Sequence, residues 1–153
     1  MQAFSEMLNN MLVAVFHNVL RIEEEFLQQI HRINLSIREM HMIEYVGKSY
    51  DVGRTLSETA EYLKVARPSV TVAARKLEEK GYFERSGCAL DGRVVRIKLT
   101  REGRKIFRYH MHFHMQMVRE LENEFCEDER ELLIRVLEKL DRFFDKSSIE
   151  ATT

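Results

Sequence analysis

Three histidines lie within five positions in the segment YHMHFHMQM, residues 109–117. His110 and His114 are four residues apart, so in an α-helix their imidazoles lie on one face, one turn apart. Imidazole is a common zinc ligand, and two histidines at this spacing can bind one ion from a single helix. Two ligands do not complete a tetrahedral site. The segment is therefore compatible with half of a metal site, part of a ligand pocket, or the edge of a packed stripe.

The length of 153 residues suits one domain, which we expect at residues 1–146, followed by a disordered tail at 147–153. The two cysteines, Cys88 and Cys126, are too few for a disulfide framework and fit a reducing cytoplasm. No apolar run approaches the roughly 20 residues that span a bilayer. The first residues lack the basic start of a secretory signal. We therefore expect a cytoplasmic protein without a membrane partner.

Charge is distributed unevenly along the chain. The whole sequence has a net charge of −1, yet residues 54–105 hold 13 Lys and Arg against 7 Asp and Glu. A basic segment between acidic ends suggests a surface that binds a polyanion.

Helical periodicity dominates the sequence and predicts six helices. Ser36 with Glu39 forms a capping-box pattern at the start of the second helix. Pro68, the only proline, suits the first turn of the fourth helix, and Gly81 suits the left-handed position after its end. The predicted helices cover residues 5–31, 35–48, 56–65, 68–80, 101–125 and 128–145.

Between the fourth and fifth helices the pattern changes to that of β-strands. The segments YFERSG and VVRIKLT are rich in β-formers, and Val95, Ile97 and Leu99 alternate with basic residues. CALDGR between them contains an Asp-Gly turn signal. The order predicts a mostly α-helical fold with a two-stranded β-wing, in which a winged helix-turn-helix covers about residues 35–100.

This arrangement places a helix in the major groove of double-stranded DNA. The residues outside the apolar face of the fourth helix offer hydroxyl and cationic groups to bases and phosphates. At the tip of the wing, Arg93 can enter a narrow minor groove, with Asp91 holding its shape. The predicted DNA-binding residues are Arg67, Ser69, Thr71, Arg75, Lys76, Asp91, Arg93 and Arg96.

The sequence resembles the MarR family of winged-helix transcription regulators over nearly its whole length. The most specific match is LEEKGYFERSGCALDGRVVRIKLTREG, which carries the Asp-x-Arg of the wing and the Leu-Thr-x-x-Gly that opens the next helix. The resemblance implies a two-fold homodimer, with dimerisation helices at about residues 5–31 and 101–145. Such a dimer would bind a pseudo-palindromic operator and act as a repressor.

Shorter motifs resemble the subgroup of this family that represses fatty-acid biosynthesis genes. They are VFHNVLRIEEEFL, LSIREMHMIEYVGK and YHMHFHMQMV. The resemblance implies a response to long-chain acyl chains on acyl carrier protein. An apolar tunnel for such a chain would be lined by Met11, Phe16, Leu20, Met42, Phe107, Met111 and Met115.

Four positions also resemble the zinc-sensing members of the family. The matching residues are Glu23, His41, His110 and His114, a donor set that suits tetrahedral zinc. No cofactor is required for the DNA-binding function, and zinc stands as an alternative to a polar network beneath the acyl cavity.

Other function classes receive less support from the sequence. It has no Gly-rich phosphate loop, no His-Glu-x-x-His and no Ser-His-Asp ordering, so we do not expect an enzyme. A redox-responsive regulator acting through Cys88, and an interaction protein that does not bind DNA, remain alternatives.

Overall fold

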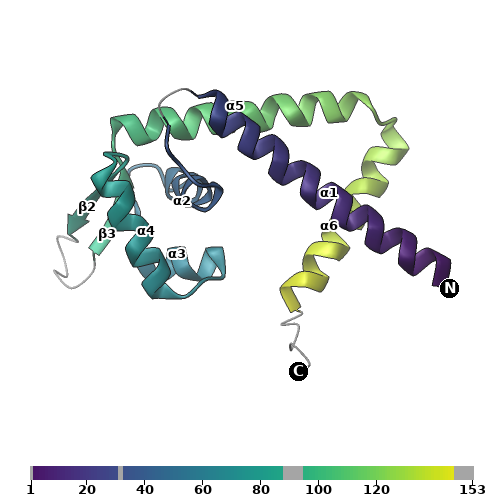
Figure 1. The fold of residues 1–153 in the computed structure, drawn as a ribbon, viewed down its shortest axis with the longest axis horizontal. Helices are drawn as coiled ribbons and strands as arrows, with labels where there is room; N and C mark the ends of the chain where they lie inside the picture. The colour runs from purple at the N-terminus through teal and green to yellow at the C-terminus, as the bar shows by residue number, and fades with distance from the viewer. Residues whose placement is uncertain (1, 31–32, 88–94, 147–153) are drawn as a thin grey trace. The chain divides into compact units, whose positions relative to one another are not determined.

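Helices make up most of the chain in a computed structural model, which describes residues 2–30, 33–87 and 95–146 (Figure 1). Each predicted helix is present, with ends shifted by a few residues: the first begins at Gln2, and the fifth ends at Asn123. Cys88, Asp91, Arg93 and the tail 147–153 lie outside the described residues. The elements are α1 (Gln2–Gln29), α2 (Ile37–Gly47), β1 (Arg54–Thr55), α3 (Leu56–Leu63), α4 (Arg67–Glu79), β2 (Phe83–Gly87), β3 (Val95–Leu99), α5 (Arg101–Asn123) and α6 (Glu127–Lys146).

Capping boxes start α2 and α3. The predicted box at Ser36 is confirmed: its Oγ accepts from the Glu39 backbone N–H at 3.3 Å, and the Glu39 carboxylate accepts from the Ser36 N–H at 2.8 Å. Thr55 and Glu58 form the same reciprocal pair, at 3.1 and 2.7 Å, before α3. Both short helices therefore begin at positions fixed by their own side chains.

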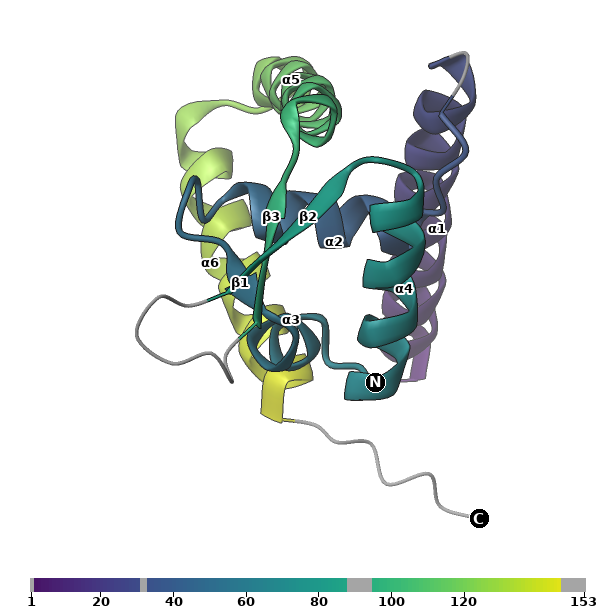
Figure 2. The same cartoon turned by 90° about the vertical axis from the view of Figure 1, so that its left-hand side faces the viewer.

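The predicted hairpin is confirmed, because β2 pairs antiparallel with β3 (Figure 2). The predicted two-stranded wing is therefore present, and the sheet contains a third strand that was not predicted, in the order β1-β3-β2. The additional strand pairs Arg54 with Ile97 and Thr55 with Arg96. A strand of two residues is too short to show the alternation by which strands are recognised, so the sequence carries no signal for it.

The core joins α2 to the helix-turn-helix and the sheet. Met40, Ile43 and Val46 of α2 are buried together with Leu77 and Ile97. Tyr45 and Tyr62 stack with ring centroids 4.0 Å apart, which adds a contact between α2 and α3. Within the part of the chain that the structure describes, no helix has both the length and the apolar character that crossing a membrane requires.

A close backbone contact fixes the start of α5. A Cβ atom at Gly103 would lie 2.2 Å from the Tyr82 carbonyl oxygen, which accepts a hydrogen bond from the Thr100 N–H at 3.0 Å. The glycine of the Leu-Thr-x-x-Gly motif therefore allows α5 to pass directly beside the residue that precedes β2.

The chain divides into two compact units, Met1–Met111 and His112–Thr153. The first contains α1 to α4, the sheet and the beginning of α5. In the second, the rest of α5 is joined to α6 through Arg130, which donates to the carbonyl oxygens of Glu122 at 2.8 Å and Phe125 at 3.1 Å.

Candidate nucleic-acid interface

The fourth helix is held between two well-defined ends. α4 begins at Arg67 with Pro68 in its first turn, where the missing N–H has no intrahelical partner to lose. Lys80 is its C-cap, and Gly81 follows with a φ of +78°, which confirms the predicted left-handed position. A three-residue turn separates α4 from α3, and Lys64 in that turn has a φ of +52°. This is the spacing of a helix-turn-helix.

One side of α4 is buried and the other is polar and basic. Val70, Ala74 and Leu77 face the core. The residues predicted to bind DNA from this helix are all exposed: Arg67, Ser69, Thr71, Arg75 and Lys76. An exposed basic face on the second helix of a helix-turn-helix is suited to the major groove.

Some of these side chains already have intramolecular partners. The Thr71 hydroxyl donates to the Arg67 carbonyl at 3.0 Å, and Arg75 pairs with Glu79 at 3.1 Å. Both contacts are exposed, so they cost little to exchange for a contact with DNA. The side chains of Arg67 and Lys76 have no hydrogen-bonding or acidic partner among the residues that the structure describes.

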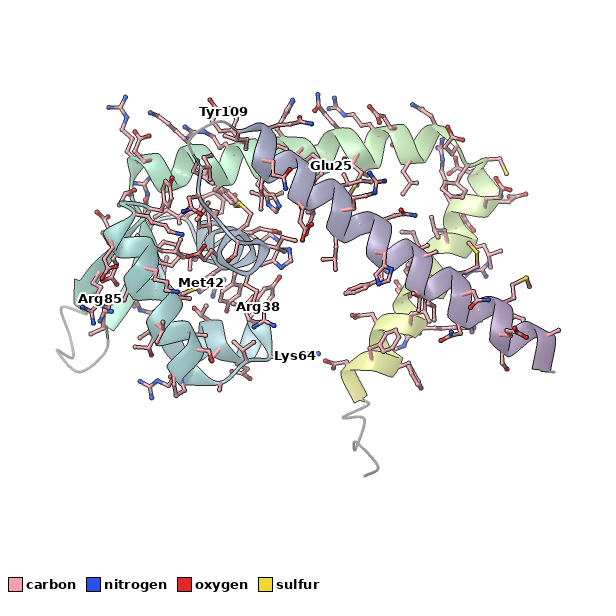
Figure 3. The ribbon with its side chains drawn as sticks, viewed as in Figure 1. Glu25, Arg38, Met42, Lys64, Arg85 and Tyr109 are labelled. Carbon is pink, nitrogen blue, oxygen red and sulfur yellow. The ribbon has the colours of Figure 1, made fainter. Side chains whose placement is uncertain are left out.

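The stem of the wing contains basic residues that are used within the fold. Arg96 donates to the Gly53 carbonyl at 3.3 Å and lies 3.6 Å from the Glu58 carboxylate. Arg85, which is labelled in Figure 3, pairs with Glu78 at 2.6 Å, and this contact joins β2 to α4. The structure thus gives Arg96 a role in holding β3 against the start of α3. This role is additional to the DNA contact that the sequence predicts for Arg96.

A polar cluster lies between α1, α2 and the first part of α5. Glu23 is buried, and its carboxylate lies 3.3 Å from Nε2 of His41. His110 is 1% exposed, offers a ligand atom within 4.8 Å of one on Glu23, and has Nδ1 3.5 Å from the Glu44 carboxylate. Three of the four predicted metal ligands are thus brought together. The fourth, His114, follows one turn later on the same helix.

The residues predicted to line an acyl tunnel differ in burial. Met42 is 1% exposed and borders a pocket of 380 Å³ formed with α3 and α4. Phe107 packs against Gly47, where a Cβ atom would lie 2.6 Å from the ring. Leu20 and Met111 are half-buried. The side chains of Met11, Phe16 and Met115 are largely exposed.

Three residues of this region were missed by the sequence analysis. Lys80 donates to both carboxylate oxygens of Glu39, at 2.8 and 2.9 Å, although 41 residues separate the two. Glu44 joins the histidine cluster from α2. Arg38 lines a groove beside α4. Arg38 and Glu44 lie within the predicted second helix, but only the packing of that helix shows what they contact.

The fold and the basic face of α4 define a winged-helix DNA-binding protein. The model of the family described as "Transcriptional regulator SarA/Rot" matches residues 25–109, and the chain belongs to this family of MarR-type winged-helix transcriptional regulators. It is similar to Streptococcus pneumoniae FabT in a complex with DNA, with 36% identity and a TM-score of 0.87 over 92% of this chain and 96% of that one.

A second similar structure is Staphylococcus aureus MepR in its DNA-binding conformation. The identity is 23% and the TM-score 0.73, over 89% of this chain and 97% of that chain. At this identity the likeness concerns the fold. Together the comparisons confirm the predicted fold class and a DNA-binding regulator of MarR type.

Proposed function

We propose that this regulator is a repressor that binds a pseudo-palindromic operator as a homodimer and controls fatty-acid biosynthesis genes in the cytoplasm, in response to long-chain acyl-acyl carrier protein. The observation that carries the proposal is the 36% identity to FabT, solved in complex with DNA, over 92% of the chain. The exposed basic face of α4 supports the DNA contact. The function is one of binding rather than catalysis.

The apolar surface of α1 supports the homodimer. Phe4, Met7 and Met11 lie at helical spacing and are 65, 61 and 57% exposed. A contiguous apolar face of this kind on a regulator is covered by a partner. A second copy of the chain is the partner that we propose, because two-fold symmetry would present two α4 helices to two half-sites of one operator.

The pocket beside Met42 supports an amphiphilic effector. Its volume of 380 Å³ falls within the roughly 300–1,000 Å³ typical of small-molecule sites. Leu63, Val65, Val70 and Ala73 supply apolar walls, and Arg38, His41 and Ser69 supply polar groups at its border. Because Ser69 and Val70 belong to α4, occupancy of this pocket would bias the position of the recognition helix.

Fluorescence anisotropy on the chain's own upstream DNA, at fixed salt, tests the proposal. Long-chain acyl-acyl carrier protein should tighten binding at least tenfold, whereas the unacylated carrier should leave it unchanged. The free-energy coupling would then be about 1.4 kcal/mol or more, within the range of allosteric effectors. Equal affinity with both carriers would contradict an acyl effector and leave the DNA-binding function intact.

The polar cluster favours zinc as a second candidate effector. Its donors, a buried carboxylate and two imidazoles, are those that zinc prefers. Glu23, His41, His110 and His114 would hold the ion, and zinc would join α1, α2 and α5. Glu44 lies at Nδ1 of His110, where a carboxylate commonly orients a ligating histidine through its second nitrogen.

The zinc alternative is tested by calorimetric titration of the metal-free protein. Wild-type protein should bind one zinc ion per chain, and His110→Ala should reduce the affinity at least tenfold. Operator affinity measured with zinc and with chelator then decides whether the site is regulatory. If zinc binds but operator affinity does not change, the cluster has a structural role.

A further inference from the structure

A groove between the start of α2 and the exposed side of α4 contains two cations that the fold does not use. Arg38, in the first turn of α2, lies on one wall, and Lys76 of α4 lies on the other. Both side chains belong to exposed residues. Within residues 2–30, 33–87 and 95–146, neither has a carboxylate or hydrogen-bond partner.

The other charges of the groove cancel. Glu39 is its acidic residue, and Lys80 donates to both of its carboxylate oxygens while Ser36 donates from its N–H and hydroxyl. Lys80 also donates to the Asn34 carbonyl at 2.6 Å, so its ammonium group is held within the fold. Arg38 and Lys76 therefore leave the groove with a net positive charge.

The position of the groove suggests which anion it receives. It runs along α4 past Pro68, Ser69, Val72 and Ala73, beside the face predicted to enter the major groove. In Figure 3 the Arg38 side chain lies on the side of α2 that faces α3, and it shares the borders of two pockets with Ser69 and Ala73 of α4. A helix inserted in the major groove has a phosphate backbone on each side of it. By helical spacing, Glu78, which pairs with Arg85 of the wing strand β2, lies on one flank of α4, and Ala73 and Lys76 of the groove lie on the other.

We propose that this groove receives the phosphate backbone beside the recognition helix, with Arg38 and Lys76 contacting phosphates from its two walls. The inference rests on the DNA-binding function and adds Arg38 of α2, which lies outside α3, α4 and the wing strands, to the interface. A guanidinium group suits this role because it presents several N–H donors to phosphate oxygens. The contact fixes the register of α4 on the duplex without reading sequence.

The test is the salt dependence of binding by the full chain, measured by anisotropy on its upstream operator and on a random duplex. Each phosphate contact contributes about 0.9 to the slope of log affinity against log salt concentration. Arg38→Ala and Lys76→Ala should each lower this slope by about 0.9 per bound chain. Arg38→Ala should weaken binding to the operator and to the random duplex by a similar factor. Arg38→Lys should keep most of the salt dependence of the wild type.

Arg108→Ala is the matched control. Arg108 is also exposed and without an acidic partner in the described part of the chain, but it lines a pocket with Gly47, Tyr50 and Phe107 rather than with α4. Its removal should leave the slope unchanged. Circular dichroism spectra and unfolding midpoints of all variants should match those of the wild type, since both substitutions in the groove are at exposed positions.

Four results would overturn the proposal, and they are distinguishable. An Arg38→Ala slope equal to that of the wild type would exclude the phosphate contact while leaving DNA binding intact. A loss confined to the operator would mean that Arg38 reads bases. Absence of salt-dependent binding by the wild type to either duplex would overturn the DNA-binding function as well. If Arg38→Ala alters only the response to acyl-acyl carrier protein, Arg38 serves the neighbouring pocket instead.

Discussion

The Lys80 ammonium group lies 2.8 Å from Glu39 Oε1, joining the C-cap of the recognition helix to the first turn of α2. Glu39 is buried and Lys80 is partly buried, so the pair is less screened than a surface salt bridge. Glu39→Gln keeps a side chain that can complete the capping box but removes the charge. It should lower the free energy of unfolding by about 1–3 kcal/mol in urea denaturation.

A double-mutant cycle tests whether Lys80 is the partner through which Glu39 stabilises the fold. If the loss in Glu39→Gln comes from the contact with Lys80, combining it with Lys80→Met should cost less than the sum of the two single changes. Additive losses would mean that the two side chains stabilise the fold independently.

Acid should remove this contribution. Burial acts to raise the pKa of Glu39, but hydrogen bonds from Lys80 and Ser36 outweigh it, so the pKa lies below its ordinary value of 4.5. A carboxyl group with a lowered pKa in the folded state stabilises the fold above its unfolded pKa, and that stabilisation is lost as the pH falls through the folded pKa. Below pH 4.5 the wild type should therefore lose stability more steeply than Glu39→Gln. Parallel curves of unfolding free energy against pH would contradict this.

Gly103 should not tolerate a side chain. Alanine there would place Cβ 2.2 Å from the Tyr82 carbonyl oxygen, a backbone atom that cannot move without breaking its hydrogen bond from Thr100. We expect Gly103→Ala to cost about 3 kcal/mol or more in thermal unfolding. Gly87→Ala is the control: among the described residues beyond its chain neighbours, no atom lies within 4 Å of its added Cβ, so its effect should stay within about 0.5 kcal/mol. Similar effects of the two substitutions would refute the steric explanation.

The Thr55 cap should be worth a measurable part of the stability. Its hydroxyl accepts from the Glu58 N–H at 3.1 Å at the start of α3. Thr55→Ala should lower the free energy of unfolding by about 1 kcal/mol, and Thr55→Ser should preserve most of it. Equal losses in the two variants, measured in urea, would assign the effect to the methyl group.

The apolar face of α1 should be needed for self-association. Met7→Asp places a charge on this exposed face, so sedimentation equilibrium should detect a shift from dimer to monomer at micromolar concentration. Asn10→Asp adds the same charge at a polar exposed position of the helix and should keep the dimer. A dimer that withstands Met7→Asp would place the contact on another surface.

Local sequence signals predicted most of the fold. Ser36 with Glu39, Pro68 and Gly81 each fix a helix end through contacts within four residues, and the structure confirms all of them. β1 escaped prediction because two residues carry no period, and its pairing with β3 depends on residues more than 40 positions away.

The candidate site was predicted only in part, because local spacing places residues on a helix face but does not show contacts between distant elements. Helical spacing was enough to put Arg67 and Lys76 on the exposed side of α4. It could not show that Arg96 reaches back to Gly53, since that contact depends on how the sheet meets the loop before it. The Lys80–Glu39 pair likewise depends on the packing of α4 against α2, which no local pattern specifies.

Three residues within a span of six positions in α2 pair with residues of three other elements. Glu39 pairs with Lys80 at the C-cap of α4, His41 with Glu23 of α1, and Glu44 with His110 of α5. All three contacts come from the same one and a half turns of a rigid helix. A change in one contact that shifts this part of α2 therefore also shifts the residues that make the other two. In evolutionary terms, the six residues of these three pairs should be inherited as a set: a substitution at Glu23 or His110 is expected to be tolerated in lineages whose residues 39 and 80 have also changed.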